Sequence, residues 1–381
     1  MTKLIVSPVQ DEKDLMAFIT FPWEVYRRDP HWVPPLISER REFLDPDRNS
    51  FFQHATARYF LARRDGRVVG TIAAFTNRLY NEYQGVNSGF FGFFEVLEDQ
   101  EAAEALLSAA ETWCREAGHE SVVGPAQFST NDEVGLLVEG FDDAPRILMT
   151  YNPPRYQHYL ESAGYSKAMD LLAYRLGIRD FVKNLPEKLV RVADKVLKRG
   201  KLRVRRVDMS RFEEEVGHVK RIYNKSWEKN WGFVPMTDPE FDRLARVLKP
   251  FVDPDLIVAA EAGDEVVGFG LTVPDLSQPL RLAYPRPGTP EALTLLKMMW
   301  HWKVRRRVDW IRIIALGVLP EYQGMGVDAL MYLETAKAAF PKGYKMAEMS
   351  WILEVNEKMN RPIVALGGEV YKRYRLYEKN L

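Results

Sequence analysis

The sequence is poor in cysteine and has no surplus of charge of either sign. Its 381 residues include one cysteine, which excludes an internal disulfide framework and suits a reducing cytosol. We expect this residue, Cys114, to be a small buried side chain in a helix. Lys plus Arg and Asp plus Glu both number 53, so no overall positive field favours a nucleic-acid partner. A chain of this length can form two domains with ordinary cores.

Long apolar runs and metal-ligand patterns are also missing. No stretch approaches the roughly 18 uncharged apolar residues of a membrane span. The first residues, Met1–Ile5, contain no apolar run long enough for a signal peptide. His54 has no second metal-ligating residue at useful spacing, so we expect no metal site. These absences predict a protein of the cytoplasm.

The most informative segment begins with a predicted strand, Trp310–Val318, which is mostly apolar and rich in β-branched residues. Two glycines follow, Gly324 and Gly326, and a helical pattern begins near Val327. Glycines allow a tight turn, and the first N–H groups of a helix point outward, which suits a phosphate. Because glycines are common at turns, these residues alone also allow a purely structural turn.

Residues 318–329 resemble the acyl-CoA diphosphate loop of the GNAT N-acyltransferase superfamily, whose pattern is Gln/Arg-x-x-Gly-x-Gly/Ala. Gln323 and Gly326 match its first two fixed positions, and Asp328 replaces the last. A carboxylate roughly 6 Å from a phosphate would repel it by ~2–3 kcal/mol at an effective dielectric constant of 20. Asp328 can instead turn away and stabilise the helix N-terminus. The resemblance implies acyl-CoA as co-substrate, bound by Leu316, Gly317, Val318, Gln323, Gly324, Met325, Gly326, Val327, Asp328 and Ala329.

The two halves of the chain repeat one pattern. Leu4–Val6 aligns with Leu202–Val204, and Val68–Gly70 aligns with Val266–Gly268 at the same offset of 198 residues. In both copies a polar turn joins two apolar strands, which predicts a hairpin. Each half then continues with strand, helix, strand, helix and a closing hairpin. This order agrees with the GNAT fold and predicts an α/β protein (an α+β mixed sheet) with two tandem GNAT-like domains.

The two copies are not chemically equivalent. Where the second has glycines, the first has four carboxylates at Glu95, Glu98, Asp99 and Glu101, which make a poor diphosphate site. We therefore predict a degenerate GNAT-like domain over 1–176, a linker over 177–201 that includes an amphipathic helix, and an acyl-CoA-binding catalytic domain over 202–381.

Transfer of an acyl group to an amine requires a base that deprotonates the ammonium. Residues 348–356 predict a fifth strand, and its period of two places polar residues on one face. The predicted catalytic residues on that face are Glu354, Asn356, Ser350 and Glu348. Only one carboxylate can sit at the thioester, because Glu348 and Glu354 are about 20 Å apart along a strand. We choose Glu354 as the base, with Asn356 orienting the substrate or pantetheine.

The position of the tyrosine in the GNAT pattern is occupied by Ile363, which leaves the general acid unassigned. Residues 348–356 and 367–377, together with Asp29–Leu36, resemble the bacterial ceramide synthase-like proteins. That resemblance implies transfer of a fatty acyl group to a sphingoid base. The alternative is a catalytically inactive tandem-GNAT protein that binds an acyl ligand or a partner, supported by Asp328 and the missing tyrosine. A transfer from aminoacyl-tRNA, as in the Fem family, would require a basic surface that the neutral charge does not provide.

Residues 290–310 combine leucine, methionine and tryptophan with a basic cluster at 303–307. Such a segment can form an acyl-chain groove, rest at a membrane surface or be an ordinary buried helix. The protein is therefore expected either free in the cytoplasm or peripherally at the inner face of the membrane. The acyl chain length, the amine acceptor and the oligomeric state are left open.

Overall fold

The computed structural model describes residues 3–187, 189–191, 193 and 202–381. They form two compact units, each built from separate stretches of the chain. The first unit contains Met1–Leu171, Ser277–Arg305 and Lys372–Leu381, and the second contains Leu172–Leu276 and Arg306–Tyr371. Most of the predicted linker helix, including residues 194–201, lies outside the described residues. The predicted domain limits come from the sequence repeat, not from these compact units, and they stay a prediction.

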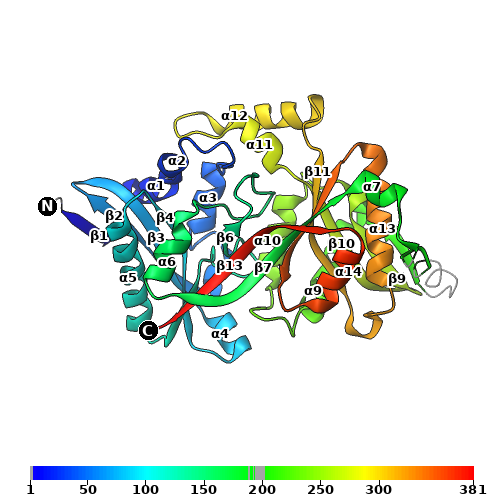
Figure 1. The fold of residues 1–381 in the computed structure, drawn as a ribbon, viewed down its shortest axis with the longest axis horizontal. Helices are drawn as coiled ribbons and strands as arrows, with labels where there is room; N and C mark the ends of the chain where they lie inside the picture. The colour runs from blue at the N-terminus through cyan, green and yellow to red at the C-terminus, as the bar shows by residue number, and fades with distance from the viewer. Residues whose placement is uncertain (1–2, 188, 192, 194–201) are drawn as a thin grey trace. The chain divides into compact units, whose positions relative to one another are not determined.

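The first unit is a mixed sheet with a long alanine- and leucine-rich helix, α5, packed on it (Figure 1). Its strands are β1 (Leu4–Pro8), β2 (Ala55–Arg64), β3 (Arg67–Asn77), β4 (Ser88–Val96), β5 (Ser121–Gly124) and the final part of β13 (Glu369–Asn380), in that order, with β6 (Leu136–Glu139) also paired to β13. Its helices are α1 (Glu12–Thr20), α2 (Pro22–Val25), α3 (Ile37–Leu44), η1 (Ser50–Gln53), α4 (Arg78–Gln84), α5 (Gln100–Glu116), α6 (Arg155–Ser162), α11 (Ser277–Ala283), α12 (Glu291–Met299) and η4 (Trp300–Val304). Cys114 is buried in α5 as predicted, and burial raises the pKa of its thiol to about 12.

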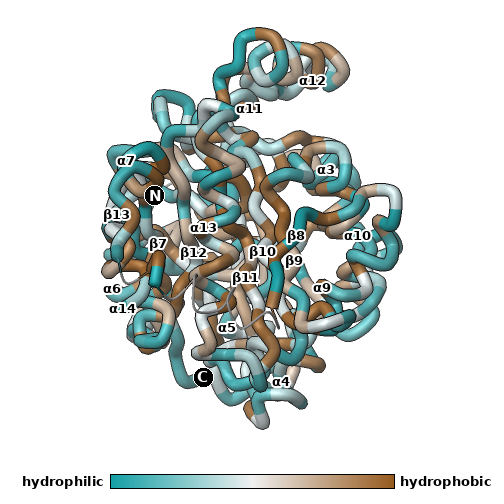
Figure 2. Tube along the Cα trace, turned by 90° about the vertical axis from the view of Figure 1, so that its right-hand side faces the viewer, coloured by the Kyte–Doolittle hydropathy of each residue, from teal (hydrophilic) through white to brown (hydrophobic). Residues whose placement is uncertain are grey.

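The second unit repeats the arrangement. Its strands follow the order β7 (Ser166–Gly177), β12 (Met346–Leu353), β11 (Trp310–Val318), β10 (Glu265–Pro274), β9 (Val258–Ala262) and β8 (Leu202–Arg206). Its helices are α7 (Ile178–Lys183), η2 (Met209–Arg211), α9 (Phe212–Ser226), α10 (Asp238–Leu248), η3 (Pro254–Leu256), η5 (Pro320–Tyr322), α13 (Val327–Ala339), η6 (Phe340–Lys342) and α14 (Glu357–Ala365). The strands β10 and β11 are largely hydrophobic in Figure 2, as expected for strands covered by helices.

Most sequence-based expectations for the fold are confirmed, but the closing hairpin predicted for each half is wrong, because α6 and α14 are each followed by a single strand, β7 and β13. Both predicted hairpins are present as β2–β3 and β9–β10. The strand predicted over 310–318 is β11, and the helix predicted from Val327 is α13. The fold class, a mixed α/β structure with two copies of one arrangement, agrees with these elements.

Each unit is completed by a strand from a distant part of the chain. Residues 377–380 of β13 pair antiparallel with residues 121–124 of β5 in the first unit. In the second unit β7 lies next to β12, and the Tyr174 hydroxyl donates to Asn360 Oδ1 on α14 at 2.9 Å. Periodicity could predict these strands but not their partners.

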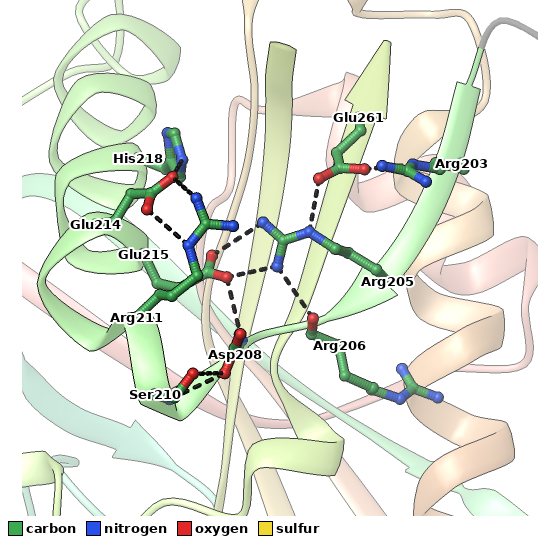
Figure 3. A network of polar contacts seen from close by, with 10 residues as sticks. All are labelled: Arg203, Arg205, Arg206, Asp208, Ser210, Arg211, Glu214, Glu215, His218 and Glu261. Atoms are coloured by element: carbon green, nitrogen blue, oxygen red, sulfur yellow. Dashed lines mark hydrogen bonds and ion pairs between the residues drawn. The ribbon is translucent and has the colours of Figure 1, made fainter. Parts of the chain in front are cut away.

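A network of paired charges fastens the edge strand β8 to its neighbours β9 and α9 (Figure 3). Arg205 on β8 donates from Nε to Glu261 on β9 at 2.6 Å, and its other nitrogens bind Glu215 on α9. Glu215 also accepts from the backbone N–H of Asp208 at 3.1 Å. The network fixes α9 on the sheet, and at its last residue the Ser226 hydroxyl donates to the carbonyl of Val318 at 3.0 Å. The end of β11 is thereby held in place.

Candidate active site

The strands β11 and β12 are parallel neighbours along only part of their length. Their paired residues run from Trp310 and Met346 to Ile313 and Met349, although β11 continues to Val318 and β12 to Leu353. On the other side of β11, an irregularity leaves Ile314 without an opposite residue on β10. The two strands therefore part at Ile314, and residues 314–318 of β11 have no paired residue on β12. In sheets with parallel strands, ligands bind at the carboxyl ends of the strands, which is where this gap opens.

The glycine loop follows directly at this end of β11. The backbone φ angles of Gly324 and Gly326 are +73° and +86°, a conformation that residues with a side chain rarely adopt. Gly326 is the N-cap of α13. A Cβ added at Gly324 would meet nothing within 4 Å, so the loop is open on that side. The Gln323 side chain donates to the carbonyl of Val318 at 3.1 Å and ties the loop to the strand end.

The start of α13 offers donors to an anion. Among the hydrogen bonds of the described residues, the backbone N–H groups of Val327, Asp328 and Ala329 have no backbone acceptor, as is normal for a first helical turn. Asp328 lies half-buried in this turn, where the helix N-terminus favours a carboxylate. Burial, and then the charge of Asp328, raise the pKa of Tyr332 one turn further along. A diphosphate bound here would meet free N–H groups and one carboxylate together, so the residues present fit an acyl-CoA with one unfavourable contact.

Glu348 and Ser350 belong to a buried polar cluster between β11 and β12. Glu348 is fully buried, and Arg312, its partner in the strand register, is 3% exposed with Nε 3.5 Å from the carboxylate. Ser350 Oγ donates to one Glu348 oxygen at 2.7 Å and accepts from Arg312 Nε at 3.1 Å. The Tyr371 hydroxyl donates to the other oxygen. Both carboxylate oxygens are therefore occupied, and the cluster fixes the two strands just before they part.

Sequence reasoning did not identify Arg312 and Tyr371 as partners of Glu348. Arg312 is the one charged residue in the apolar strand 310–318, and that exception was a usable signal. Tyr371 gave no comparable signal, because it lies 23 residues from Glu348 and contacts it through tertiary folding. Two other tyrosines of β13, Tyr374 and Tyr377, are buried.

The strand predicted over residues 348–356 is β12, which ends at Leu353, so the placement of Glu354 and Asn356 on its polar face is wrong and both lie beyond its end, apart from the buried cluster. Glu354 is half-buried in the turn before α14, and its backbone carbonyl accepts from the Asn360 side chain at 3.1 Å. Asn356 is the N-cap of α14, and its Oδ1 accepts from the backbone N–H of Met359 at 3.3 Å. The strands β11 and β12 are parallel neighbours. Glu354 follows the carboxyl end of β12, as the glycine loop follows the carboxyl end of β11. The catalytic roles assigned to these residues stay predictions.

The first unit has the same parting of strands, but in the part that the structure describes no comparable anion site follows it. Its parallel pair, β4 and β5, is registered only from Ser88 and Ser121 to Phe90 and Val123. The N-terminus of the following helix α5 is capped by Asp99, which Arg64 contacts at 2.9 Å. Arg64 also binds Glu101 at 2.8 Å. A carboxylate and a guanidinium of the protein thus occupy the place that a diphosphate would take.

Membrane spans and metal clusters are both absent from the described residues. No helix among them has the length and apolar character needed to cross a bilayer. No group of three or more His, Cys, Asp or Glu side chains among them is arranged to hold a metal ion.

Comparison with known proteins gives two relatives along the whole chain. It is 36% identical over 386 residues to the bacterial ceramide synthase of Caulobacter vibrioides (strain NA1000 / CB15N), covering 99% of this chain and 98% of that protein. It is 35% identical over 381 residues to protein YghO of Escherichia coli (strain K12), with coverage of 99% and 95%. No protein-family model matches the chain.

Solved structures share its architecture at low sequence identity. A tandem GNAT protein from the clavulanic acid biosynthesis pathway has a TM-score of 0.56 at 12% identity, covering 99% of this chain and 98% of that one. A GCN5-related N-acetyltransferase from Sphaerobacter thermophilus has a TM-score of 0.51 at 15% identity, with coverage of 99% and 95%. The predicted tandem GNAT fold is thereby confirmed.

Proposed function

The chain belongs to the family of the Caulobacter vibrioides bacterial ceramide synthase, a group of tandem GNAT proteins, and from this premise we propose that it is an acyl-CoA-dependent N-acyltransferase. The reaction would move an acyl group from a thioester to an amine. The observation that carries the proposal is the parting of β11 and β12 beside an open glycine loop at the start of α13.

In this proposal the second unit binds acyl-CoA. The N–H groups of residues 326–329 hold the diphosphate, and the edge of β11 over residues 314–318, which has no partner on β12, pairs with the pantetheine. The thioester then lies in the gap between the two strands, with backbone donors available to its carbonyl oxygen.

Glu354 is the proposed base, which accepts a proton from the ammonium of the acceptor. Of the two carboxylates of residues 348–356, it is the one that solvent reaches, whereas Glu348 is fully buried with both oxygens occupied. The departing thiolate needs no side-chain acid, since a thiol ionises near pH 8–9. The name of the relative supports a fatty acyl donor and a long-chain amine acceptor such as a sphingoid base.

The loop can be tested by introducing a negative charge without backbone strain. Met325 is 47% exposed in the loop, outside the positive-φ positions. Met325→Glu should abolish the thermal stabilisation produced by acetyl-, octanoyl- or palmitoyl-CoA, while the matched neutral variant Met325→Gln keeps it. Gly326→Glu should also abolish it, but its φ of +86° adds strain, so Met325 is the cleaner position. If acyl-CoA raised the Tm of Met325→Glu as much as that of wild type, the acyl-CoA would have to bind elsewhere.

An inactive binding protein is the second candidate, favoured by the carboxylate of Asp328 at the loop. It predicts acyl-CoA binding without turnover. Incubation with palmitoyl-CoA and a sphingoid base, followed by mass spectrometry of the products, separates the two functions, since release of free CoA together with an amide requires catalysis.

We further propose peripheral membrane contact through residues 290–310. Along α12 and the following turn, Leu293, Leu296, Trp300 and Val304 are 51%, 67%, 54% and 58% exposed, so this segment is not a buried helix; its hydrophobic parts are visible in Figure 2. Lys303 lies over the ring of Trp302 at 3.5 Å. Exposed apolar side chains beside cations are suited to an anionic lipid surface.

Sedimentation with anionic liposomes tests this contact. Wild type should co-sediment in a salt-sensitive manner, and Leu296→Glu should sharply reduce the bound fraction. Leu296→Ala, which removes the apolar side chain without adding charge, should have a smaller effect. Equal sedimentation of wild type and Leu296→Glu would contradict the contact.

A further inference from the structure

The first unit contains a small polar cavity that the acyl-CoA site does not use. Its volume is about 50 Å³, which is room for about three to five water-sized atoms, since ~10–15 Å³ holds one. The cavity lies beside β4 at the point where β4 and β5 part. Its polar lining comes from two carboxylates, two amides and three hydroxyl groups, namely Glu95, Glu133, Gln127, Asn152, Thr150, Tyr151 and Tyr156.

Glu95 is held rigidly at this cavity by two buried tyrosines. The Tyr26 hydroxyl lies 2.9 Å from both carboxylate oxygens, and the Tyr156 hydroxyl donates to one of them at 2.8 Å. The ring of Tyr26 stacks on Trp32, with centroids 4.9 Å apart and an interplanar angle of 12°. Trp32 belongs to the segment 29–36 that carries the family resemblance, so this segment supports the carboxylate.

The charges around Glu95 do not neutralise it by direct contact. Arg40 lies 3.7 Å from Glu133, and Arg155 Nη1 lies 3.9 Å from Glu98. The ionisable groups that face Glu95 from the surrounding elements are Tyr26, Arg40, Glu133, Tyr151, Arg155 and Tyr156. No ion pair of Glu95 with a cation is present among the described residues.

Burial raises the pKa of the Glu95 carboxyl to about 8. Hydrogen bonds from Tyr156 and Tyr26 and the charges of Arg155 and Arg40 act in the opposite direction and do not overcome it. Near neutral pH most of the protein therefore carries Glu95 protonated, and a cation that enters the cavity would stabilise its charged form.

We propose that this cavity is a binding site for the ammonium group of a small primary amine, with the Glu95 carboxylate as its counter-ion. The carboxylate supplies the charge, and the oxygen atoms of the lining hydroxyl and amide groups accept the remaining hydrogen bonds of the ammonium. The volume admits an ammonium with one or two further heavy atoms, so the rest of a larger amine would extend outside. This site lies entirely in the first unit and does not depend on acyl-CoA binding in the second.

Proton linkage gives this proposal a specific signature. With a pKa of about 8, most of Glu95 is protonated at pH 7. Binding of an ammonium selects the charged form, so protons should be released on binding at pH 7 and fewer should be released at pH 9. The affinity should rise as the pH increases through 8 and fall again once the amine loses its own proton near pH 10.

Isothermal titration with ethanolamine, in two buffers of different ionisation enthalpy, measures this proton release directly. Glu95→Gln keeps an acceptor for the tyrosine hydroxyls but cannot be charged, and it should lower the affinity at least tenfold and abolish the release. The matched control is Glu98→Gln, because that side chain is 86% exposed and its loss should leave both quantities unchanged. Ethylene glycol, which resembles the ligand but is uncharged, should not compete.

Absence of proton release by wild type at pH 7, or ethanolamine binding by Glu95→Gln equal to wild type, would overturn the proposal. The wild-type measurement decides even if Glu95→Gln is unstable. The acyl-CoA proposal is tested independently of this one. Met325→Glu should abolish CoA binding and retain the calorimetric signal of ethanolamine binding.

Discussion

Replacing Glu348 by glutamine should destabilise the second unit more than any other single change at β11 and β12 described above. Arg312 and Glu348 are 3% and 0% exposed, and the guanidinium lies 3.5 Å from the carboxylate. At an effective dielectric constant of about 20, that separation corresponds to about 5 kcal/mol of attraction. Removal of one partner of a buried pair leaves the other charge uncompensated and typically costs about 3–5 kcal/mol.

For a unit of this size, 1 kcal/mol shifts the Tm by about 2–4 °C, so Glu348→Gln should lower it by roughly 6–20 °C. Thermal unfolding followed by circular dichroism measures the shift. The double variant Arg312→Met with Glu348→Gln should recover much of the lost stability, because it leaves no unpaired buried charge. A fall of less than 2 °C in Glu348→Gln, or a double variant less stable than that single variant, would refute the reasoning.

Three further predictions concern the site and its support. Glu354→Gln should lower turnover at least a hundredfold, as loss of a general base does, with the Tm and palmitoyl-CoA binding unchanged; equal turnover in steady-state assays would remove Glu354 from the mechanism. Asp328→Asn should tighten CoA binding by about 30- to 150-fold in titration calorimetry, because it removes a repulsion of ~2–3 kcal/mol next to the diphosphate, and unchanged affinity would show that the carboxylate points away. Partial burial tends to raise the pKa of Glu261, but hydrogen bonds from Arg205 and Arg203 outweigh it and lower that pKa. The ion pairs of Glu261 therefore stabilise the fold above its ordinary pKa of 4.5, and this stabilisation is lost as the pH falls through the lowered pKa. The Tm difference between wild type and Glu261→Gln should thus be present at pH 7 and disappear in acid. A Tm difference that does not change with pH would contradict this prediction.

Local features of the site could be predicted from the sequence, whereas its long-range contacts could not. The limits of β11 and the start of α13 follow from β-branched apolar residues and from glycines with positive φ. The pattern of alternate residues placed Glu348 and Ser350 on one face, and their hydrogen bond agrees. The same pattern gave no information on whether that face is buried, because burial depends on Arg312 and Tyr371.

The importance of Glu95 was also hidden in the sequence. It was grouped with three other carboxylates as a sign of degeneracy, and two of those, Asp99 and Glu101, do bind Arg64. Glu95 differs because its partners, Tyr26 and Tyr156, lie 69 and 61 residues away. No spacing rule connects residues at such separations, so only the folded chain distinguishes a buried acid from its solvated neighbours.

The pairing of β13 with β5 also determines when the first unit can finish folding. Tyr377 is opposite Gly124 in the strand register, so this sheet includes a contact of very high sequence separation. Closing so long a loop carries an entropic cost, and folds rich in such contacts form slowly. During synthesis, the N-terminal unit leaves the ribosome with one strand of its sheet missing and stays incomplete until residues 372–381 emerge. The two halves of the sequence are therefore not independent folding units, and an isolated N-terminal half would expose the unpaired edge of β5 to other chains.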